Sequence, residues 1–250
     1  DVNSLGRSLA ETEARRVRLL GEVAHELRTP LTVIDGYVEG MLDQVLPTDA
    51  GSLGQVLDES RRLRRLADDL SALSRAEEGR LELKRGTADV RPVVAAAAER
   101  LRPQAQDAGL TLRVDCGAVP LVADIDADRI SQVVTNLVGN AIRATPAGGS
   151  VAVACTGADA WVVLEVADTG EGLAPADLDR VFERFYRVPG RAGAGQDSGT
   201  GIGLTISREI IRGHGGDLVA ASAGPGAGAV FTARLPRIAG ASGPAVPATA

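Results

Sequence analysis

Two long stretches of apolar residues at helical spacing most constrain how this chain can fold. The first runs from Leu20 to Val45 and the second from Leu53 to Leu73, with apolar residues in steps of three and four. Such a seam is typical of helices that pack against helical partners. The turn residues from Pro47 to Gly51 separate the two stretches and predict a hairpin. Two amphipathic helices of this length cannot bury an apolar face alone, so the economical solution is a homodimeric four-helix bundle.

The first predicted helix also carries chemistry, because His25, Glu26 and Thr29 stand within one helical turn and Pro30 follows directly. In a helix, His25 and Thr29 lie on the same face, and Glu26 is adjacent to both. His25 lies well away from the apolar seam and is therefore expected to face solvent. The pattern predicts a titratable nucleophile with a neighbouring base and a hydroxyl that can position water.

Length and composition exclude several classes of protein. The chain has 250 residues, enough for two modest domains or one large one. A net charge of −6 and a pI of about 5.1 argue against nucleic acid as the main partner. The longest apolar run, Val93 to Ala98, is far shorter than the ~20 residues that span a bilayer. Cys116 and Cys155 are far apart in the sequence without metal-like spacing, and we interpret them as buried, reduced thiols in preference to a disulfide.

From Val90 onward the pattern changes to alternating helices and strands. Helices are predicted over Val93–Leu101 and Asp128–Ala144. Strands are predicted at Leu110–Val114, Val151–Cys155, Trp161–Val166, Leu218–Ala221 and Val230–Leu235. The segment Arg80–Asp89 is interpreted as a short linker or a first strand. The tail after Arg237, rich in Ala, Gly and Pro, is predicted to be disordered.

Four separated segments of this half carry residue types that suit a nucleotide. The first is a helix in which Asn136 and Asn140 share a face, and their amide oxygens suit Mg²⁺ that also holds phosphate oxygens. Arg143, three residues on, suits a phosphate. Asparagine pairs in helices also commonly cap or pair with the backbone, and that alternative stays open.

The second segment is Asp168-Thr169-Gly170-Glu171-Gly172, directly after a predicted strand. A carboxylate there can accept a hydrogen bond from the exocyclic amine of adenine, and the glycines let the backbone approach the ligand. The same residues also make a simple tight turn, which is the alternative interpretation.

The third segment runs from Phe182 to Arg187 and is followed by a Gly- and Ala-rich run from Gly190 to Ser198. Phe182 and Phe185 anchor the base of a loop, or are ordinary core residues on one helix face. The run beyond them is expected to behave as a mobile lid that brings Arg184, Arg187 or Arg191 to phosphates on closure.

The fourth segment is Gly199-Thr200-Gly201-Ile202-Gly203-Leu204, which opens a predicted helix. Its alternate glycines expose amide donors at a helix N-terminus, where the helix dipole favours phosphate. Its spacing and late position exclude the dinucleotide fingerprint, and the chain lacks the motifs of P-loop proteins and of the protein kinase fold.

The order of these motifs resembles that of the sensor histidine kinases, the phosphodonor half of bacterial two-component systems. The block from Glu22 to Thr32 resembles their H-box, and the resemblance covers about residues 5 to 236. It implies an α + α/β fold class: an antiparallel helical hairpin forming a dimeric four-helix bundle, then an α/β-sandwich ATP-binding domain of the GHKL (Bergerat) type. The implied domains are the end of a HAMP-like connector helix (1–16), a dimerisation and histidine phosphotransfer domain (17–78), a linker (79–89), the ATP-binding domain (90–237) and a tail (238–250).

The same resemblance assigns roles to residues. His25 would be the phosphoacceptor, Glu26 would take or orient its proton, and Thr29 would position water for dephosphorylating a partner. Asn140 would hold Mg²⁺ with support from Asn136. Asp168 would read adenine in a pocket lined by Gly170 and Gly172. The implied nucleotide-binding set also includes Arg143, Tyr186, Arg187, Gly199, Thr200, Gly201, Ile202, Gly203 and Leu204. His214, among glycines at a helix end, is interpreted as a turn or capping residue.

The resemblance therefore implies an ATP- and Mg²⁺-dependent protein histidine kinase. It would autophosphorylate His25, pass the phosphoryl group to an aspartate of a response-regulator receiver domain, and act as a phosphatase on that regulator. Its partners would be a second copy of the chain and the receiver domain, with no nucleic acid. Contact with a membrane would come only through upstream segments: this fragment is expected in the cytoplasm and the full-length protein in the bacterial inner membrane.

Two positions depart from the family pattern. Ala144 stands where the family usually has an aromatic residue or histidine, and Ala229 stands where it has a hydroxyl. Both departures predict weaker nucleotide binding, which low-micromolar or tighter affinity for an ATP analogue in calorimetry would contradict. They also motivate an alternative, a non-catalytic signalling scaffold that senses nucleotide. A third alternative, a GHKL enzyme of the gyrase or chaperone kind, is disfavoured because such an enzyme does not need the H-box bundle.

Overall fold

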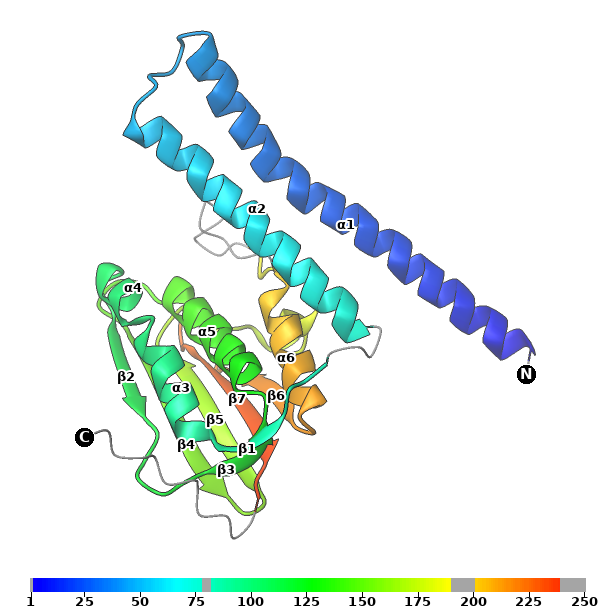
Figure 1. Cartoon of the computed structure of the whole chain (residues 1–250), viewed down its shortest axis with the longest axis vertical. Helices are drawn as coiled ribbons and strands as arrows, with labels where there is room; N and C mark the ends of the chain where they lie inside the picture. Colours follow the sequence, from blue (N-terminus) through cyan, green and yellow to red (C-terminus); the bar gives the residue numbers. More distant parts are fainter. Residues whose placement is uncertain (1, 78–81, 190–200, 239–250) are drawn as a thin grey trace. The chain divides into compact units, whose positions relative to one another are not determined.

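The first part of the chain forms the helical hairpin that the apolar spacing predicts. The computed structural model describes residues 2–77, 82–189 and 201–238, and it contains helix α1 (Val2–Leu42) followed by helix α2 (Ala50–Glu77) (Figure 1). Helix α1 continues through Pro30, although proline cannot donate the usual helical hydrogen bond. Asp49 caps α2, because its carboxylate accepts a hydrogen bond from the amide of Ser52 at 2.9 Å.

The connection between the two helices differs from the turn predicted at Pro47–Gly51. Helix α1 ends at Leu42, and Gln44 then adopts a positive φ of 59°. The amides of Val45 and Leu46 both donate to the carbonyl of Gly40, at 2.9 and 2.8 Å. This left-handed helix ending places Val45 in the turn with 79% of its surface exposed, so its predicted place in the seam is wrong.

The second unit is built on a mixed five-stranded sheet. The chain divides into two compact units, Asp1–Ser71 and Ala72–Ala250. The sheet of the second has the order β2-β4-β5-β7-β6, with β2 parallel to β4 and the other neighbours antiparallel. Its strands are β2 (Thr111–Asp115), β4 (Ser150–Ala158), β5 (Trp161–Asp168), β6 (Asp217–Ala221) and β7 (Ala229–Pro236). Buried residues alternate along β5, as expected for a sheet with one covered face.

Helices cover one face of this sheet and complete the predicted α/β sandwich (Figure 1). They are α3 (Val90–Glu99), α5 (Ala127–Ala144) and α6 (Gly203–Gly213). Helices α3 and α5 begin one to three residues earlier than predicted, because Asp89 and Asp126 cap them by accepting hydrogen bonds from backbone amides. The predicted fold class is confirmed.

His214 ends α6, which confirms its predicted capping role. The ring is buried, and its Nε2 accepts a hydrogen bond from the amide of Asp126 at 2.9 Å. Nδ1 therefore carries the proton and donates to the carbonyl of Ile210 at 2.8 Å. Burial lowers the pKa of His214, which favours this neutral form. The neutral ring thus joins the end of α6 to the start of α5.

Several short elements were not predicted. Strand β1 (Gly86–Asp89) occupies only the end of the predicted linker or strand, and it pairs antiparallel with an unpredicted strand, β3 (Val122–Ile125). Helix α4 (Arg102–Asp107) and two 3-10 turns, η1 (Pro175–Asp177) and η2 (Arg180–Phe182), were also missed. Residues 79–81 of the predicted linker and 239–250 of the predicted tail lie outside the described residues. Among the described helices, none has the length and apolar character needed to cross a membrane.

Candidate functional site

The first candidate site lies on α1, where the predicted His25 is exposed to solvent. Glu26 is half-buried, and its carboxylate lies 4.0 Å from the guanidinium of Arg62 on α2. The hydroxyl of Thr29 donates to the carbonyl of His25 at 3.4 Å, so it is exposed but bonded within the helix. Pro30, one residue on, is buried. The hairpin thus leaves the imidazole of His25 accessible, and Arg62 on the second helix holds the neighbouring carboxylate of Glu26.

The second candidate site begins on α5, whose buried face packs on the sheet. Asn136 and Asn140 are both half-buried on this helix. The side-chain amide of Asn136 donates to the carbonyl of Gly203 at 3.3 Å and to the hydroxyl of Ser207 at 3.4 Å. Asn136 therefore ties α5 to the start of α6, which is the backbone-pairing alternative left open above. The amide oxygen of Asn140 accepts a hydrogen bond from the guanidinium of Arg143.

Asp168 ends β5 and is buried, with 8% of its surface exposed. One carboxylate oxygen accepts from the amide of Gly170 at 2.9 Å and from the amide of Ala229 at 3.2 Å. The segment is therefore a tight turn and also a fixed, buried carboxylate, so the two interpretations of this motif are compatible.

The glycines of the Asp168 turn are required by close backbone approach. A Cβ added at Gly170 would lie 2.2 Å from the carbonyl oxygen of Ala144, at the end of α5. A Cβ at Gly172, which has a φ of +66°, would lie 2.1 Å from the carbonyl oxygen of Gly224. The amide of Glu171 donates to the carbonyl of Ala144 at 3.0 Å, which fixes the turn against α5.

The two positions that depart from the family pattern both adjoin this turn. The carbonyl of Ala144 accepts a hydrogen bond from the amide of Glu171. Ala229 pairs with Asp168 in the sheet, and its amide donates a hydrogen bond to the Asp168 carboxylate. The backbone contacts that shape the turn are thus present with alanine at both positions. The side-chain groups that an aromatic residue and a hydroxyl would supply are the parts that are missing.

Phe182 and Phe185 of the third segment do not lie on one helix face, which was one of the two interpretations, because the 3-10 turn ends at Phe182. Phe182 ends η2 and is core, with its ring 6.3 Å from that of Phe231 in an edge-on contact. Phe185 has a positive φ of 56° and is only half-buried. The hydroxyl of Tyr186 donates to the carboxylate of Asp177 at 2.6 Å, an interaction that the sequence pattern does not indicate. Arg187 is exposed.

The fourth segment begins α6 at Gly203. Gly201 has a φ of +71°, and its carbonyl accepts from the amide of Phe185 at 3.0 Å. Ile202 is fully buried and Leu204 is half-buried. The predicted Gly199 and Thr200, like the lid run with Arg191, lie outside the described residues.

Hydrogen bonds bring the four segments together around helices α5 and α6. Asn136 donates to the carbonyl of Gly203 through its side chain. The backbone amides of Glu171 and Phe185 donate to the carbonyls of Ala144 and Gly201, respectively. The hydroxyl of Thr205 also donates to the carbonyl of Phe182 at 2.8 Å. Segments spread over almost 70 residues of sequence thus share one region of the second unit. Thr205 and Ser207 support this region, and no signal in the sequence distinguished them from ordinary helix residues.

Comparisons with known proteins agree with this arrangement. The His Kinase A (phospho-acceptor) domain matches residues 15–79, and the histidine kinase-, DNA gyrase B- and HSP90-like ATPase matches residues 125–239. The sensor protein SrrB of Staphylococcus aureus is 37% identical over 224 residues, which are 87% of this chain and 37% of SrrB. The chain therefore spans little more than a third of the length of that curated relative.

Two solved structures extend the likeness to the fold. The histidine kinase AdeS of Acinetobacter baumannii superposes with a TM-score of 0.71 at 28% identity, covering 85% of this chain and 97% of AdeS. Full-length ShkA in complex with AMPPNP has a TM-score of 0.65 at 25% identity, covering 90% of this chain and 47% of ShkA. The chain belongs to the sensor histidine kinases, and it carries their phospho-acceptor domain followed by their ATPase-like domain.

Proposed function

We propose that this chain is the kinase core of a sensor histidine kinase, which transfers the γ-phosphoryl group of ATP to His25. The observation that carries the proposal is the exposed His25 beside a held carboxylate, on a phospho-acceptor hairpin joined to an ATPase-like domain. A nitrogen of His25 forms the bond to the γ-phosphorus while the bond to the bridging oxygen breaks and ADP leaves. Positioning and charge stabilisation supply the rate enhancement.

Glu26 is proposed to accept or orient the proton of the His25 ring, which keeps the attacking nitrogen unprotonated. Its carboxylate is half-buried and lies 4.0 Å from Arg62, so the guanidinium limits where it can turn. Arg62 also lies 3.8 Å from Glu59 and is thus shared between two carboxylates. The phosphoryl group is then proposed to pass from His25 to an aspartate on a response-regulator receiver domain.

The ATP site is proposed to lie where the four segments of the second unit meet. Asp168 would accept from the exocyclic amine of adenine, in a pocket that Gly170 and Gly172 would line. Support comes from ShkA, a 25% identical structure solved with AMPPNP. The remaining proposed contacts to the nucleotide are Asn136, Arg143, Tyr186, Arg187, Gly199, Thr200, Gly201, Ile202, Gly203 and Leu204.

The residues near Asn140 fit Mg²⁺ that is shared with the nucleotide. The amide oxygen of Asn140 is a hard ligand that Mg²⁺ accepts beside phosphate oxygens and water. The described residues hold no cluster of three or more His, Cys, Asp or Glu that would bind a metal ion without the nucleotide. When bound, Mg²⁺ supplies positive charge to the phosphate oxygens. Arg143, which donates to Asn140, supplies a second positive charge from the same helix.

We expect Asp168→Asn to weaken binding of an ATP analogue by about 2–3 kcal/mol, roughly 30- to 150-fold in Kd. An asparagine keeps one acceptor for the amides of Gly170 and Ala229, but it turns a donor toward the amine of adenine. Isothermal calorimetry with AMPPNP measures the change. Glu165→Gln is the matched control, because it removes a carboxylate from the same strand on its opposite face and should leave the Kd unchanged. Equal Kd values for Asp168→Asn and the wild type would refute the assigned role.

A homodimer formed through the hairpin is proposed because one copy leaves apolar residues uncovered. Five leucine and valine side chains of the two helices are between 38% and 76% exposed: Leu31, Val38, Leu42, Leu53 and Leu57. Four of them belong to the predicted seam, Leu42 lies four residues after Val38, and a second hairpin would bury all five.

Leu57→Glu should therefore convert a dimer into a monomer, because it places a charge in the buried seam. Sedimentation velocity at micromolar protein measures the mass of each species. Arg64→Glu, a charge change at an exposed position of the same helix, should remain dimeric. A wild-type monomer, or a dimer that tolerates Leu57→Glu, would contradict the proposed interface.

Thr29 is proposed to position water for dephosphorylating the regulator. Its hydroxyl is exposed and has only a long bond of 3.4 Å to the carbonyl of His25, so Thr29→Ala leaves α1 intact. We expect dephosphorylation of a phosphorylated receiver domain to fall at least about tenfold, while autophosphorylation changes less than about twofold. Thr32→Ala, which removes a similar helical hydroxyl bond, is the control. Equal loss of both activities in Thr29→Ala would refute this division of labour.

The kinase core is further proposed to act on the cytoplasmic side of the inner membrane as part of a longer sensor. Segment Leu5–Leu19, which resembles a connector from a membrane-proximal domain, motivates this, as does the 37% share of SrrB that the chain spans. Fractionation of cells that express the complete gene product tests it, and recovery of that product in the soluble fraction would contradict it.

The second candidate function is a nucleotide-sensing scaffold without kinase activity. It is favoured by Ala144 and Ala229, which both adjoin the Asp168 turn and lack the family's side chains. Binding of AMPPNP without any phosphorylation of His25 would support the scaffold over the kinase.

A further inference from the structure

The fold brings together two cysteines that are far apart in the sequence. Strands β2 and β4 are parallel neighbours, and their register pairs Asp115 with Ala154. Cys116 directly follows β2 and Cys155 directly follows Ala154 in β4, so the parallel register, continued by one residue, brings Cys116 opposite Cys155. Adjacent strands lie about 4.8 Å apart, within the range of Cα separations that a disulfide spans. Both cysteines are free thiols, and each affects the pKa of the other, as expected for side chains that lie close together.

The two thiols differ in their access to solvent. Cys155 is 3% exposed and faces the core, whereas Cys116 is half-buried at the end of β2. The residues that follow Cys116, from Gly117 to Pro120, are all exposed. A small reagent can therefore reach Cys116 more readily than Cys155.

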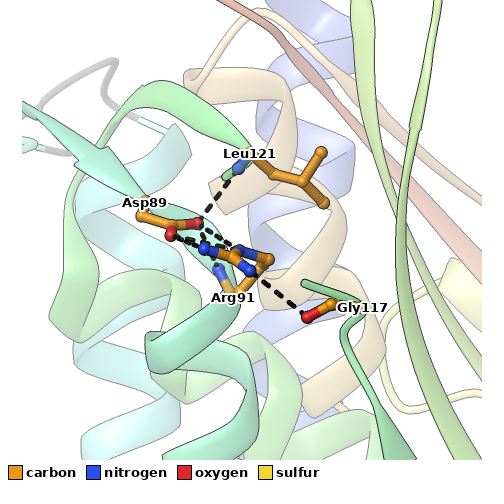
Figure 2. Close-up of polar contacts among 4 residues, drawn as sticks. All are labelled: Asp89, Arg91, Gly117 and Leu121. Atoms are coloured by element: carbon orange, nitrogen blue, oxygen red, sulfur yellow. Dashed lines mark hydrogen bonds and ion pairs between the residues drawn. The ribbon is translucent and has the colours of Figure 1, made fainter. Parts of the chain in front are cut away.

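Polar contacts hold the loop after Cys116 at both of its ends (Figure 2). Arg91 donates to the carbonyl of Gly117 at 3.2 Å, and the carboxylate of Asp89 accepts from the amide of Leu121 at 3.1 Å. Arg91 and Asp89 are themselves joined by an ion pair of 2.6 Å. These contacts hold the backbone of the loop on either side of the exposed residues 118–120.

Charge and burial set the order in which the thiols react. Burial raises the pKa of both cysteines, that of Cys155 to about 12. The neighbouring thiol of Cys155 lowers the pKa of Cys116, as does the positive charge of Arg91, whereas the carboxylates of Asp115 and Asp89 raise it. Cys116 therefore deprotonates before Cys155, and the thiolate is the reactive form of a cysteine.

We propose that Cys116 and Cys155 form a thiol–disulfide exchange site, which a small-molecule disulfide oxidises to a disulfide between β2 and β4. The thiolate of Cys116 attacks one sulfur of the reagent, forms a mixed disulfide and releases one thiolate of the reagent. The sulfur of Cys155 then attacks Cys116, closes the disulfide within the chain and releases the second thiolate. Two electrons pass from the protein to the reagent, which leaves as two thiols with the two protons.

The disulfide would enclose the segment of chain that carries β3, α5 and the start of β4. Asn136 and Asn140 lie within that closed loop, although the cysteines lie away from Asp168, which pairs with Val151 near the start of β4. Closing a loop of this length restricts the unfolded chain, so the oxidised protein should melt about 5–10 °C higher than the reduced protein. This inference does not depend on the proposed kinase activity.

The test is equilibration of the whole chain in glutathione disulfide and glutathione at several ratios. Remaining thiols are then alkylated with N-ethylmaleimide in denaturant, and intact mass and peptide mapping identify the products. We expect the oxidised wild type to carry no alkyl group, no glutathione and a Cys116–Cys155 link, with the higher melting temperature. Two alkylatable thiols at every ratio, a stable glutathione adduct or a disulfide between chains would overturn the proposal.

Two single substitutions test the order of reaction. Cys155→Ser should accumulate one glutathione adduct on Cys116, because the resolving thiol is absent. Cys116→Ser should leave Cys155 unmodified in the folded protein, because that thiol is buried. Equal rates of adduct formation in the two variants would overturn the assigned order. The masses and melting temperatures of the wild type show whether the disulfide forms, and this result does not depend on whether the two variants fold.

Discussion

Gly170→Ala is expected to abolish nucleotide binding and to lower the free energy of unfolding by about 2–4 kcal/mol. The added Cβ would lie 2.2 Å from the carbonyl oxygen of Ala144 and 2.9 Å from the carboxylate of Asp168. A backbone carbonyl cannot rotate away as a flexible side chain can, so either the end of α5 or the turn after β5 must move. Movement of the turn displaces the carboxylate proposed to read adenine.

Gly86→Ala is the matched control, because a Cβ there meets nothing within 4 Å and the backbone has no positive φ. It should change the free energy of unfolding by less than about 0.5 kcal/mol and leave nucleotide affinity unchanged. Urea unfolding gives the stability of each variant, and calorimetry with AMPPNP gives the affinity. Wild-type stability and affinity in Gly170→Ala would show that the turn is neither tight nor part of the site.

The helical hairpin was predictable because its signal is repeated over many residues. Apolar residues in steps of three and four, with a polar break near Pro47, determine two helices whatever the exact turn. The turn itself was misplaced, since the left-handed conformation of Gln44 depends on local hydrogen bonds to Gly40 and not on turn-forming residue types. Val45 continued the apolar spacing although the helix had already ended.

The sandwich was predicted in its long elements and missed in its short ones. Strands β5 and β7 have eight residues each and carry enough β-branched and aliphatic residues to be recognised. Strand β3 has only four residues, and three of them, Val122, Ala123 and Ile125, are buried, so no alternation is visible. Its partner β1 is polar and gains its structure from pairing.

The candidate site was predicted by residue type and spacing, but its contacts depend on tertiary structure. Asp168 and Gly170 were identified from the sequence, whereas the carbonyl of Ala144 that requires the glycine comes from a different element. Asn136 was interpreted as a support for Mg²⁺, and no pattern in the sequence indicates that its side-chain amide also joins α5 to Gly203. The pairing of Cys116 with Cys155 was equally invisible, because it follows from the parallel register of β2 and β4.

His25→Gln should lose all phosphorylation by ATP while keeping wild-type nucleotide affinity. Glutamine retains a polar side chain at this exposed helix position, so the hairpin should fold unchanged, but its amide nitrogen is not a nucleophile. The chain has only two histidines, and the other, His214, is buried with 3% exposure. His214→Gln therefore serves as the matched control, and it should still be phosphorylated at a temperature where it stays folded.

The most direct measurement is incubation of the chain with γ-labelled ATP and Mg²⁺, beside His25→Gln and His214→Gln. The kinase proposal predicts label that is stable in alkali and labile in acid, present in the wild type and His214→Gln and absent in His25→Gln. Label that persists in His25→Gln, or an unlabelled wild type that still binds ATP, would contradict the proposal that this chain is a kinase acting on His25.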